Sequence, residues 1–313
     1  MTGWTVEDMP PLTDRTVVVT GANSGLGLEG SKAFARKGAT VVMACRSGDR
    51  GETAARDIRD AVPEATLDVR ECDLADLSNV ASFAEGLRDE YDAVDVLCNN
   101  AGVMAIPRSE TADGFETQFG VNHLGHFALT GRLLPLLRAA DGEARVVTQS
   151  SGAHEMGDID FEDLQGERSY GKWSAYGQSK LANLLFAYEL QRRLGNHGWD
   201  DVLSVACHPG YADTDLQFRG PREMGSTLRT AAMGLANAVL AQSAEQGALP
   251  MLYAATADDV IGGEYVGPGG LFDMRGPPEF QQSNAASRDE ATAERLWAVS
   301  TDLTGVEYDF ERA

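Results

Sequence analysis

The sequence predicts an α/β fold, a single-domain, doubly wound parallel sheet of about seven strands with helices on both faces. Three observations support this prediction. Short β-branched runs alternate with longer stretches of helical periodicity. A glycine-rich turn joins the first such run to the first helical stretch. Small and polar residues follow the apolar runs, at the strand ends where doubly wound sheets bind their ligands.

The chain has 313 residues and no composition break or Gly/Ser/Pro-rich linker, so one domain over residues 1–313 is expected. Within it we expect a core over about 14–275, a lid over about 211–241 and a C-terminal tail over about 277–313 with a surface helix. The lid is expected because residues 221–241 are apolar and carry little charge, although a plain core helix fits the same pattern.

Composition excludes several classes of function. A formal charge of −22 disfavours nucleic acid as a partner, because phosphate neutralisation needs clustered Lys and Arg. The four cysteines lack metal-ligand or redox spacing and are expected to be buried free thiols, as suits a reducing cytoplasm. The N-terminus lacks signal-peptide features, and no run reaches the roughly 18 apolar residues of a membrane helix. We expect a cytoplasmic protein that binds neither nucleic acid nor membrane.

The first strand is expected over residues 15–20, followed by the glycine-rich turn and a helix through Ala35. In this context, backbone amides and a helix N-terminus can bind a pyrophosphate. Glycines would permit the tight turn, the approach of the phosphates and the contact of helix with sheet. A purely structural turn is the alternative. The residues expected to bind a dinucleotide here are Gly21, Asn23, Ser24, Gly25, Leu26 and Gly27.

The second strand, residues 40–45, ends directly before Arg46. An Arg at this place can pair with the 2′-phosphate of NADP, whereas NAD enzymes usually place a carboxylate there. Asp49 lies three residues further on, next to an expected helix over 51–61. We therefore expect NADP rather than NAD, with solvated loop charges as the alternative.

The third and fourth strands, residues 66–71 and 94–98, also end in candidate cofactor ligands. Asp73 is placed to meet an adenine amino group or to cap the helix expected over about 77–91. Small residues after the fourth strand let the backbone approach a ribose. The expected ligands are Asp73, Leu74, Asn99, Ala101 and Gly102.

A long helix is expected from Phe119 to Leu137, with the polar Asn122 bonding to backbone or holding a water. His123 and His126 lack a third ligand, so no metal is expected. The next strand, residues 144–149, precedes Ser150 and Ser151. Neither serine lies in a Gly-x-Ser-x-Gly elbow, which disfavours a hydrolase.

Tyr176 and Lys180 lie one turn apart on the same side of an expected helix. A phenol titrates near pH ~10, and a neighbouring ammonium group stabilises its phenolate. An ordinary pair of helical neighbours is the alternative. The strand over 201–207 ends in Pro209, Gly210 and Thr214, and a helix over 243–256 and a strand over 263–266 are expected to complete the sheet.

Together these residues resemble the short-chain dehydrogenase/reductase family over about 14–275, within it the retinol dehydrogenase branch and its WW-domain oxidoreductase relatives. The matched pieces are Thr20-Gly-x-x-x-Gly-x-Gly27, Asp73, Asn99-Asn-Ala-Gly102, Asn122, Ser150-Ser151, Tyr176-x-x-x-Lys180, Pro209-Gly210 and Thr214. The resemblance implies a Rossmann-type fold and a catalytic tetrad of Asn122, Ser151, Tyr176 and Lys180.

By resemblance, Tyr176 exchanges a proton with the substrate oxygen, and Ser151 orients that oxygen. Lys180 lowers the phenol pKa and holds the nicotinamide ribose, while Asn122 fixes a water. The implied function is an NADP(H)-dependent alcohol dehydrogenase or carbonyl reductase acting on an apolar alcohol, aldehyde or ketone. A non-catalytic NADP(H)-binding regulator and an epimerase or dehydratase are the alternatives. Relatives often pair through the helices that hold Asn122 and Tyr176, so a homo-oligomer remains open.

Overall fold

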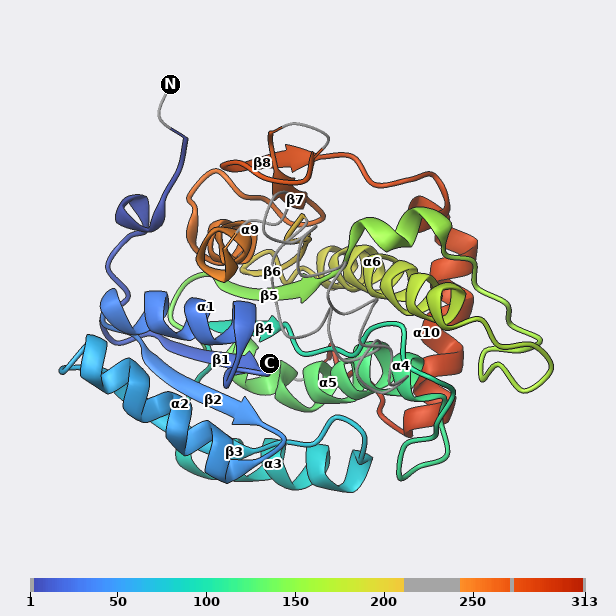
Figure 1. Cartoon of the computed structure of the whole chain (residues 1–313), viewed down its shortest axis with the longest axis horizontal. Coiled ribbons are helices and arrows are strands. Elements are labelled where there is room, and N and C mark those ends of the chain that lie inside the picture. The colour runs from blue at the N-terminus through green and yellow to red at the C-terminus, as the bar shows by residue number, and fades with distance from the viewer. Residues whose placement is uncertain (1–2, 211–242, 271–272, 312–313) are drawn as a thin grey trace, which may run out of the picture.

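The computed structural model describes residues 3–210, 243–270 and 273–311, and within them one sheet crosses the molecule (Figure 1). Its eight described strands run in the order β3-β2-β1-β4-β5-β6-β7-β8, all parallel except β8, which pairs antiparallel with β7. The strands are β1 Thr16–Thr20, β2 Thr40–Cys45, β3 Thr66–Glu71, β4 Val96–Asn99, β5 Ala144–Gln149, β6 Val202–Cys207, β7 Tyr265–Pro268 and β8 Pro278–Gln281. The predicted α/β class is therefore confirmed, with one strand more than the seven expected.

Helices lie on both faces of the sheet. The α-helices are α1 Gly25–Arg36, α2 Gly48–Ala61, α3 Leu77–Glu90, α4 Thr117–Phe119, α5 Gly125–Arg138, α6 Lys172–Asn196, α9 Ala244–Thr256 and α10 Glu290–Thr304. A π-helical turn, η2 Gly120–Leu124, joins α4 to α5, and short 3₁₀ turns are η1 Val6–Asp8, η3 Gly152–Met156 and η5 Ala286–Arg288.

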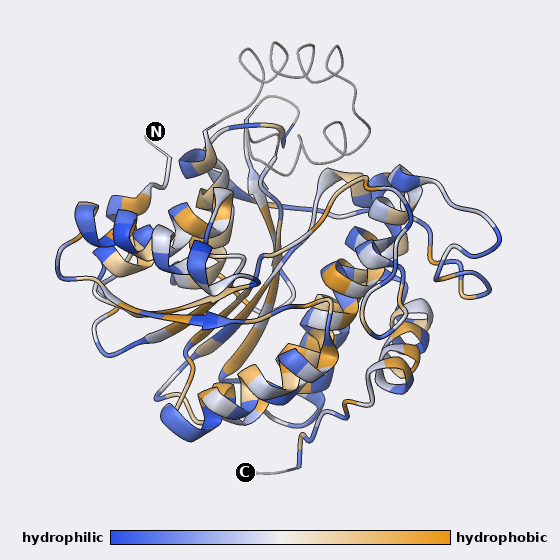
Figure 2. Cartoon of the chain, turned by 60° about the horizontal axis from the view of Figure 1, so that its bottom comes forward, coloured by the Kyte–Doolittle hydropathy of each residue, from blue (hydrophilic) through white to orange (hydrophobic). Residues whose placement is uncertain are grey.

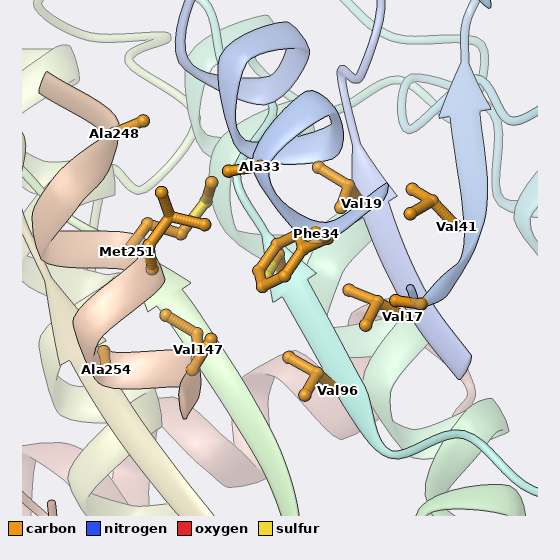
Figure 3. Close-up of a cluster of buried hydrophobic side chains, with 14 of the residues drawn as sticks. Val17, Val19, Ala33, Phe34, Val41, Val96, Val147, Ala248, Met251 and Ala254 are labelled. Atoms are coloured by element: carbon orange, nitrogen blue, oxygen red, sulfur yellow. The ribbon is translucent and has the colours of Figure 1, made fainter. Parts of the chain in front are cut away.

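Successive side chains along a strand point to opposite faces of the sheet, and this divides the core into two layers. Val17 and Val19 of β1 pack with α1, α2 and α9, and Figure 3 shows Phe34 of α1 and Met251 of α9 in this layer. Val18, between them in sequence, packs on the opposite face with α3, α5 and α6. Because both faces are covered, β1 and β2 are apolar along almost their whole length, as buried parallel strands are expected to be. Hydrophobic colour is correspondingly concentrated where the helices meet the sheet (Figure 2).

The C-terminal segment differs from the prediction of a surface helix. Trp297 of α10 is buried at 7% exposure, with its ring centroid 5.1 Å from that of Phe127 and 5.9 Å from that of Phe186. Farther along, the Tyr308 hydroxyl donates to the Phe127 carbonyl at 2.7 Å. The helix is amphipathic, and its polar residues concealed the face that packs on α5 and α6 (Figure 1).

Two other expectations need comment. The helix expected over 51–61 begins at Gly48, and the single helix expected from Phe119 is interrupted by η2. The lid expected over 211–241 lies outside the described residues, and the division into core, lid and tail stays a prediction. Among the described residues, every helix is too short or too polar to span a bilayer.

Candidate active site

The candidate site lies where the strand order reverses, between the carboxyl ends of β1 and β4. In doubly wound sheets such a switch point opens a crevice for ligands. A pocket opens here, lined by Thr20, Gly21, Asn23, Ser24, Gly25, Leu26, Gly27, Arg46, Arg50, Cys72, Asp73, Leu74, Ala75, Asn100, Ala101, Gly102, Val103, Thr117 and Val121. It therefore contains most of the cofactor ligands expected from the sequence.

The glycine-rich turn is held against the end of β4. Thr20 Oγ1 accepts hydrogen bonds from the amides of Asn100 and Ala101, both at 2.9 Å, and Asn100 Nδ2 donates to the Thr20 carbonyl at 2.8 Å. A Cβ on Gly27 would overlap the Gly21 carbonyl and lie 2.6 Å from Asn100 Nδ2. Only glycine therefore lets helix α1 approach this closely.

This turn leaves the N-terminus of α1 able to bind an anion. Gly21 and Gly25 have positive φ angles of 68° and 54°, a conformation that glycine adopts without strain. The N-cap residue Ser24 makes no side-chain capping hydrogen bond, so its side chain does not occupy the first amides of α1. The pocket therefore fits a dinucleotide, with its pyrophosphate at the start of this helix.

At the adenosine end of the pocket, two exposed arginines stand close in sequence. Arg46 follows β2, and Arg50 lies one turn later in the first turn of α2. Among the described residues neither guanidinium forms an ion pair with a carboxylate, although the chain has 48 acidic residues. Arg50 was missed by sequence reasoning, which placed the start of the helix at residue 51.

Asp73 does not cap α3, whose N-cap is Asp76, and its contact with an adenine amino group stays a prediction. Asp73 lines the pocket, and its Oδ1 accepts a hydrogen bond from the amide of Ala75 at 3.0 Å, which stabilises the turn before α3. A side chain that stabilises a turn is held in a fixed position, so its carboxylate is presented to the pocket in a defined place.

Some expected ligands lie elsewhere. Asn99 is fully buried outside the pocket, and its Nδ2 donates to Thr130 Oγ1 at 2.9 Å. Its neighbour Asn100 lines the pocket instead. Pro209 and Gly210 follow β6 at the same edge of the sheet but do not line this pocket, and Thr214 lies outside the described residues.

The four expected catalytic residues come together beside Gly102. A Cβ on this pocket-lining glycine would lie 3.1 Å from Asn122 Oδ1 and 3.6 Å from Lys180 Nζ. Lys180 Nζ is 5.8 Å from the centre of the Tyr176 ring, and the Ser151 side chain lies close enough to the Tyr176 hydroxyl to lower the pKa of the phenol. The tetrad thus borders the dinucleotide pocket.

Each member is fixed by further contacts. Lys180 Nζ donates to the Gln149 carbonyl at 3.0 Å. Asn122 Oδ1 accepts from the Val103 amide at 2.8 Å, and its Nδ2 donates to the Val103 carbonyl at 2.9 Å, so Asn122 bonds to backbone, as one of its two sequence readings allowed. Ser150 Oγ is buried and donates to the Lys180 carbonyl, which leaves Ser151 as the serine that meets the phenol.

Burial acts against both charged forms of the Tyr–Lys pair. It raises the pKa of the Tyr176 phenol to about 12, an effect only partly offset by the Ser151 hydrogen bond. It lowers the pKa of the Lys180 ammonium group to about 8. The expected lowering of the phenol pKa by Lys180 therefore does not appear in the protein alone and stays a prediction for the complex with cofactor.

The two histidines near the site are held as neutral packing residues. A hydrogen bond of 2.9 Å joins His126 Nε2 to Thr20 Oγ1, and one of 2.8 Å joins His123 Nε2 to Ser300 Oγ of α10. Burial lowers their pKa values to about 3 for His123 and about 4 for His126. Across the described ranges, no group of three His, Cys, Asp or Glu side chains is placed to hold a metal ion.

Comparison with known proteins agrees with this geometry. The family model described as short chain dehydrogenase matches residues 15–223. Human retinol dehydrogenase 13 is 41% identical over 310 residues, covering 98% of this chain and 89% of the relative. Mouse polyprenol dehydrogenase is 41% identical over 302 residues, covering 95% of this chain and 86% of the relative.

Solved structures share the fold. A crystal structure of an uncharacterized protein from Mycobacterium paratuberculosis is 44% identical, with a TM-score of 0.80 and coverage of 98% of this chain and 99% of that one. A Beutenbergia cavernae structure described as an NAD(P)-dependent gluconate 5-dehydrogenase with bound NADP is 27% identical, with a TM-score of 0.61 and coverage of 81% and 94%.

Proposed function

Because the chain belongs to the short chain dehydrogenase family and is therefore an oxidoreductase that uses NAD(P), we propose that it is an NADP(H)-dependent alcohol dehydrogenase or carbonyl reductase with Tyr176 as its acid and base. The observation that carries the proposal is the grouping of the Tyr176 phenol with the Ser151 side chain and with Lys180, which lies one turn further along α6. These groups border a pocket that fits a dinucleotide.

When bound, the nicotinamide supplies or accepts the hydride. In reduction, the Tyr176 hydroxyl donates its proton to the substrate oxygen, and the Ser151 hydroxyl donates a hydrogen bond that orients this oxygen. In oxidation, the Tyr176 oxygen takes the proton back from the alcohol. The positive charge of Lys180 stabilises the phenolate in both directions, and Asn122 holds the loop at Val103 beside it.

An apolar alcohol or carbonyl compound is the proposed substrate. Relatives at about 40% identity are named retinol dehydrogenase and polyprenol dehydrogenase. Both names describe alcohols with extended apolar groups, which supports the same class for this chain.

The proposal is tested by removing only the phenolic hydroxyl. Tyr176→Phe is expected to lower kcat/KM for carbonyl reduction by about a hundredfold or more, because the acid is lost, while NADPH still binds. Stopped assays of NADPH oxidation and calorimetric titration of NADPH measure the two effects. Substantial turnover in this variant would reject Tyr176 as the acid. Net consumption of NADPH by the wild type also separates a reductase from an epimerase.

Preference for NADP over NAD is supported by Arg46 and Arg50, which line the pocket without carboxylate partners. Arg46→Asp should lower kcat/KM with NADPH by roughly 10- to 100-fold, because a charge-assisted hydrogen bond to the 2′-phosphate is replaced by repulsion. With NADH the loss should be much smaller.

The matched control is Arg56→Asp, which makes the same change of charge on an exposed residue of α2 outside the pocket. The assignment of Arg46 to the 2′-phosphate would be contradicted if Arg46→Asp lowered kcat/KM equally with NADPH and NADH. An equal loss of kcat/KM in Arg56→Asp would contradict it as well.

A further inference from the structure

Trp173 is an exposed tryptophan beside the proposed acid. It lies in the first turn of α6, three residues before Tyr176, and is 48% exposed, whereas Tyr176 is 4% exposed. The two rings meet edge to face, with their centroids 6.2 Å apart and their planes at 77°. A large apolar surface therefore stands open next to the phenol.

A second exposed apolar side chain lies on the element that is capped by Ser151. Four large apolar side chains are conspicuously exposed among the described residues, namely Met156, Trp173, Ile261 and Phe280. Trp173 is on the helix of Tyr176, and Met156, 62% exposed, ends η3, the turn whose N-cap is Ser151. Apolar surface thus flanks both groups proposed to hold the substrate oxygen.

The two elements that carry these side chains are in direct backbone contact. A Cβ on Gly177 would lie 2.9 Å from the Ala153 carbonyl and 3.1 Å from the Gly157 amide nitrogen. Met156 precedes Gly157, and Tyr176 precedes Gly177. The apolar surface on η3 and the phenol on α6 are therefore kept in a fixed relation.

The backbone beneath Trp173 is also anchored. Gln118 is fully buried, and its Nε2 donates to the Lys172 carbonyl at 3.0 Å and to the Tyr170 hydroxyl at 2.9 Å. Its Oε1 accepts from the Ala105 amide at 2.6 Å, which ties this turn to the loop after β4. An indole that is open to solvent on so constrained a backbone is a preorganised apolar surface.

We propose that Trp173 is a specificity-determining residue whose indole binds the apolar group of the alcohol or carbonyl substrate while Tyr176 meets its oxygen. The inference rests on the proposed function and narrows it: the substrate carries an extended hydrocarbon or aromatic group next to the reacting carbon. Aromatic side chains offer a large apolar area at low entropic cost, so covering the exposed half of an indole favours long substrates over short ones.

The test compares two aldehydes that differ only in length. With saturating NADPH, Trp173→Ala should lower kcat/KM for decanal by ~10- to 100-fold, mainly through KM, with a much smaller effect for butanal. Trp173→Phe should restore most of the loss. The control is Ile261→Ala, which removes an apolar side chain that is 63% exposed, against 48% for Trp173. Ile261 lies in the loop before β7, at the amino ends of the parallel strands, and its removal should change the kinetics of neither substrate.

A binding measurement keeps the inference separate from the proposed function. In the NADPH-loaded protein, in which an alcohol cannot be oxidised, decan-1-ol should change the tryptophan emission of the wild type but not of Trp173→Phe, and butan-1-ol should have little effect on either. Absence of turnover with every aldehyde would reject the proposed function, while the emission titration would still decide the inference. The inference would be overturned if Trp173→Ala lowered kcat/KM equally for decanal and butanal, or left both values unchanged. A change of oligomeric mass in that variant would also overturn it, because Trp173 would then belong to a subunit interface.

Discussion

Lys180 carries its charge in a place where burial opposes it. The side chain is 3% exposed, and the pKa of its ammonium group is lowered to about 8, whereas an exposed lysine titrates near ~10.4. Below the lower value the group is charged in both folded and unfolded chains, so burial of the charge destabilises the fold in full. Between the two values only the unfolded chain keeps the proton, and this destabilisation shrinks as pH rises.

Lys180→Met is therefore expected to raise the free energy of unfolding at pH 7, by about 1–3 kcal/mol, while turnover is lost. The Gln149 carbonyl would keep a partner, because Asn183 Nδ2 donates to it at 2.9 Å. This increase in the free energy of unfolding should be smaller at pH 10. Urea unfolding of the wild type and of Lys180→Met at pH 7 and pH 10 measures the difference.

Lys32→Met is the control for this prediction, because Lys32 lies on the surface of α1 with its side chain 27% exposed. Lys32→Met should produce no comparable pH-dependent increase in the free energy of unfolding. A Lys180→Met variant that is less stable than the wild type at pH 7 would show that the lysine's contacts outweigh its burial.

At the scale of elements, the contact of η3 with α6 positions the site. Ser151 is the N-cap of η3 and Tyr176 lies on α6. The two elements meet through Gly157 and Gly177, where a side chain would strike backbone atoms. The placement of the serine beside the phenol therefore depends on glycine at a point where no side chain takes part in the chemistry.

Two glycines of α6 allow a matched test. Gly→Ala inside a helix ordinarily stabilises it by about 0.5–1 kcal/mol, and Gly195→Ala should do so, because a Cβ there meets nothing within 4 Å. Gly177→Ala should instead separate η3 from α6 and lower kcat by ~10- to 100-fold. Thermal unfolding and NADPH oxidation would distinguish them, and unchanged kcat in Gly177→Ala would reject this role for the contact.

The elements also show where sequence reasoning succeeds. β2, β3 and β5 have the predicted bounds, because each is a short run whose apolar or alternating pattern is complete within itself. β8 was missed because it lies at the edge of the sheet and pairs with β7 across a loop, with only Pro278 buried. Such pairing depends on a distant strand and leaves little local pattern.

In the site, too, local patterns were predictable and contacts between distant residues were not. The Tyr176–Lys180 pair was predictable because its spacing places both residues on one side of a helix. Arg50 was not, because its place in the pocket depends on the start of α2 at Gly48. The anchoring of the α6 turn by Gln118 was also missed, since it joins residues more than fifty positions apart.

At the scale of the whole molecule, the C-terminal segment occupies the outer side of α5 and α6. Trp297 packs against both Phe127 and Phe186, and the Arg193 guanidinium lies 4.4 Å from the centre of the indole ring. Val306 and Tyr308 leave no room for a Cβ on Gly131 of α5. These helices hold or adjoin Tyr176 and Asn122, through which related enzymes often pair.

We therefore expect the protein not to pair through α5 and α6, because its own chain covers them. Light scattering coupled to size exclusion should give the mass of one chain, or of an assembly that cross-linking places on other surfaces. A dimer with cross-links between the α5 or α6 helices of two chains would contradict this expectation.

The position of α10 also bears on how the protein is made. Trp297 follows Phe127 and Phe186 by more than a hundred positions in the sequence, yet it completes the aromatic cluster that these two residues form on α5 and α6, and Ser300 of the same helix bonds to His123. During synthesis α10 leaves the ribosome after α5 and α6. The nascent chain can therefore bury Phe127 and Phe186 fully only once α10 has been made, and a chain terminated before α10 would expose this aromatic surface to aggregation or proteolysis.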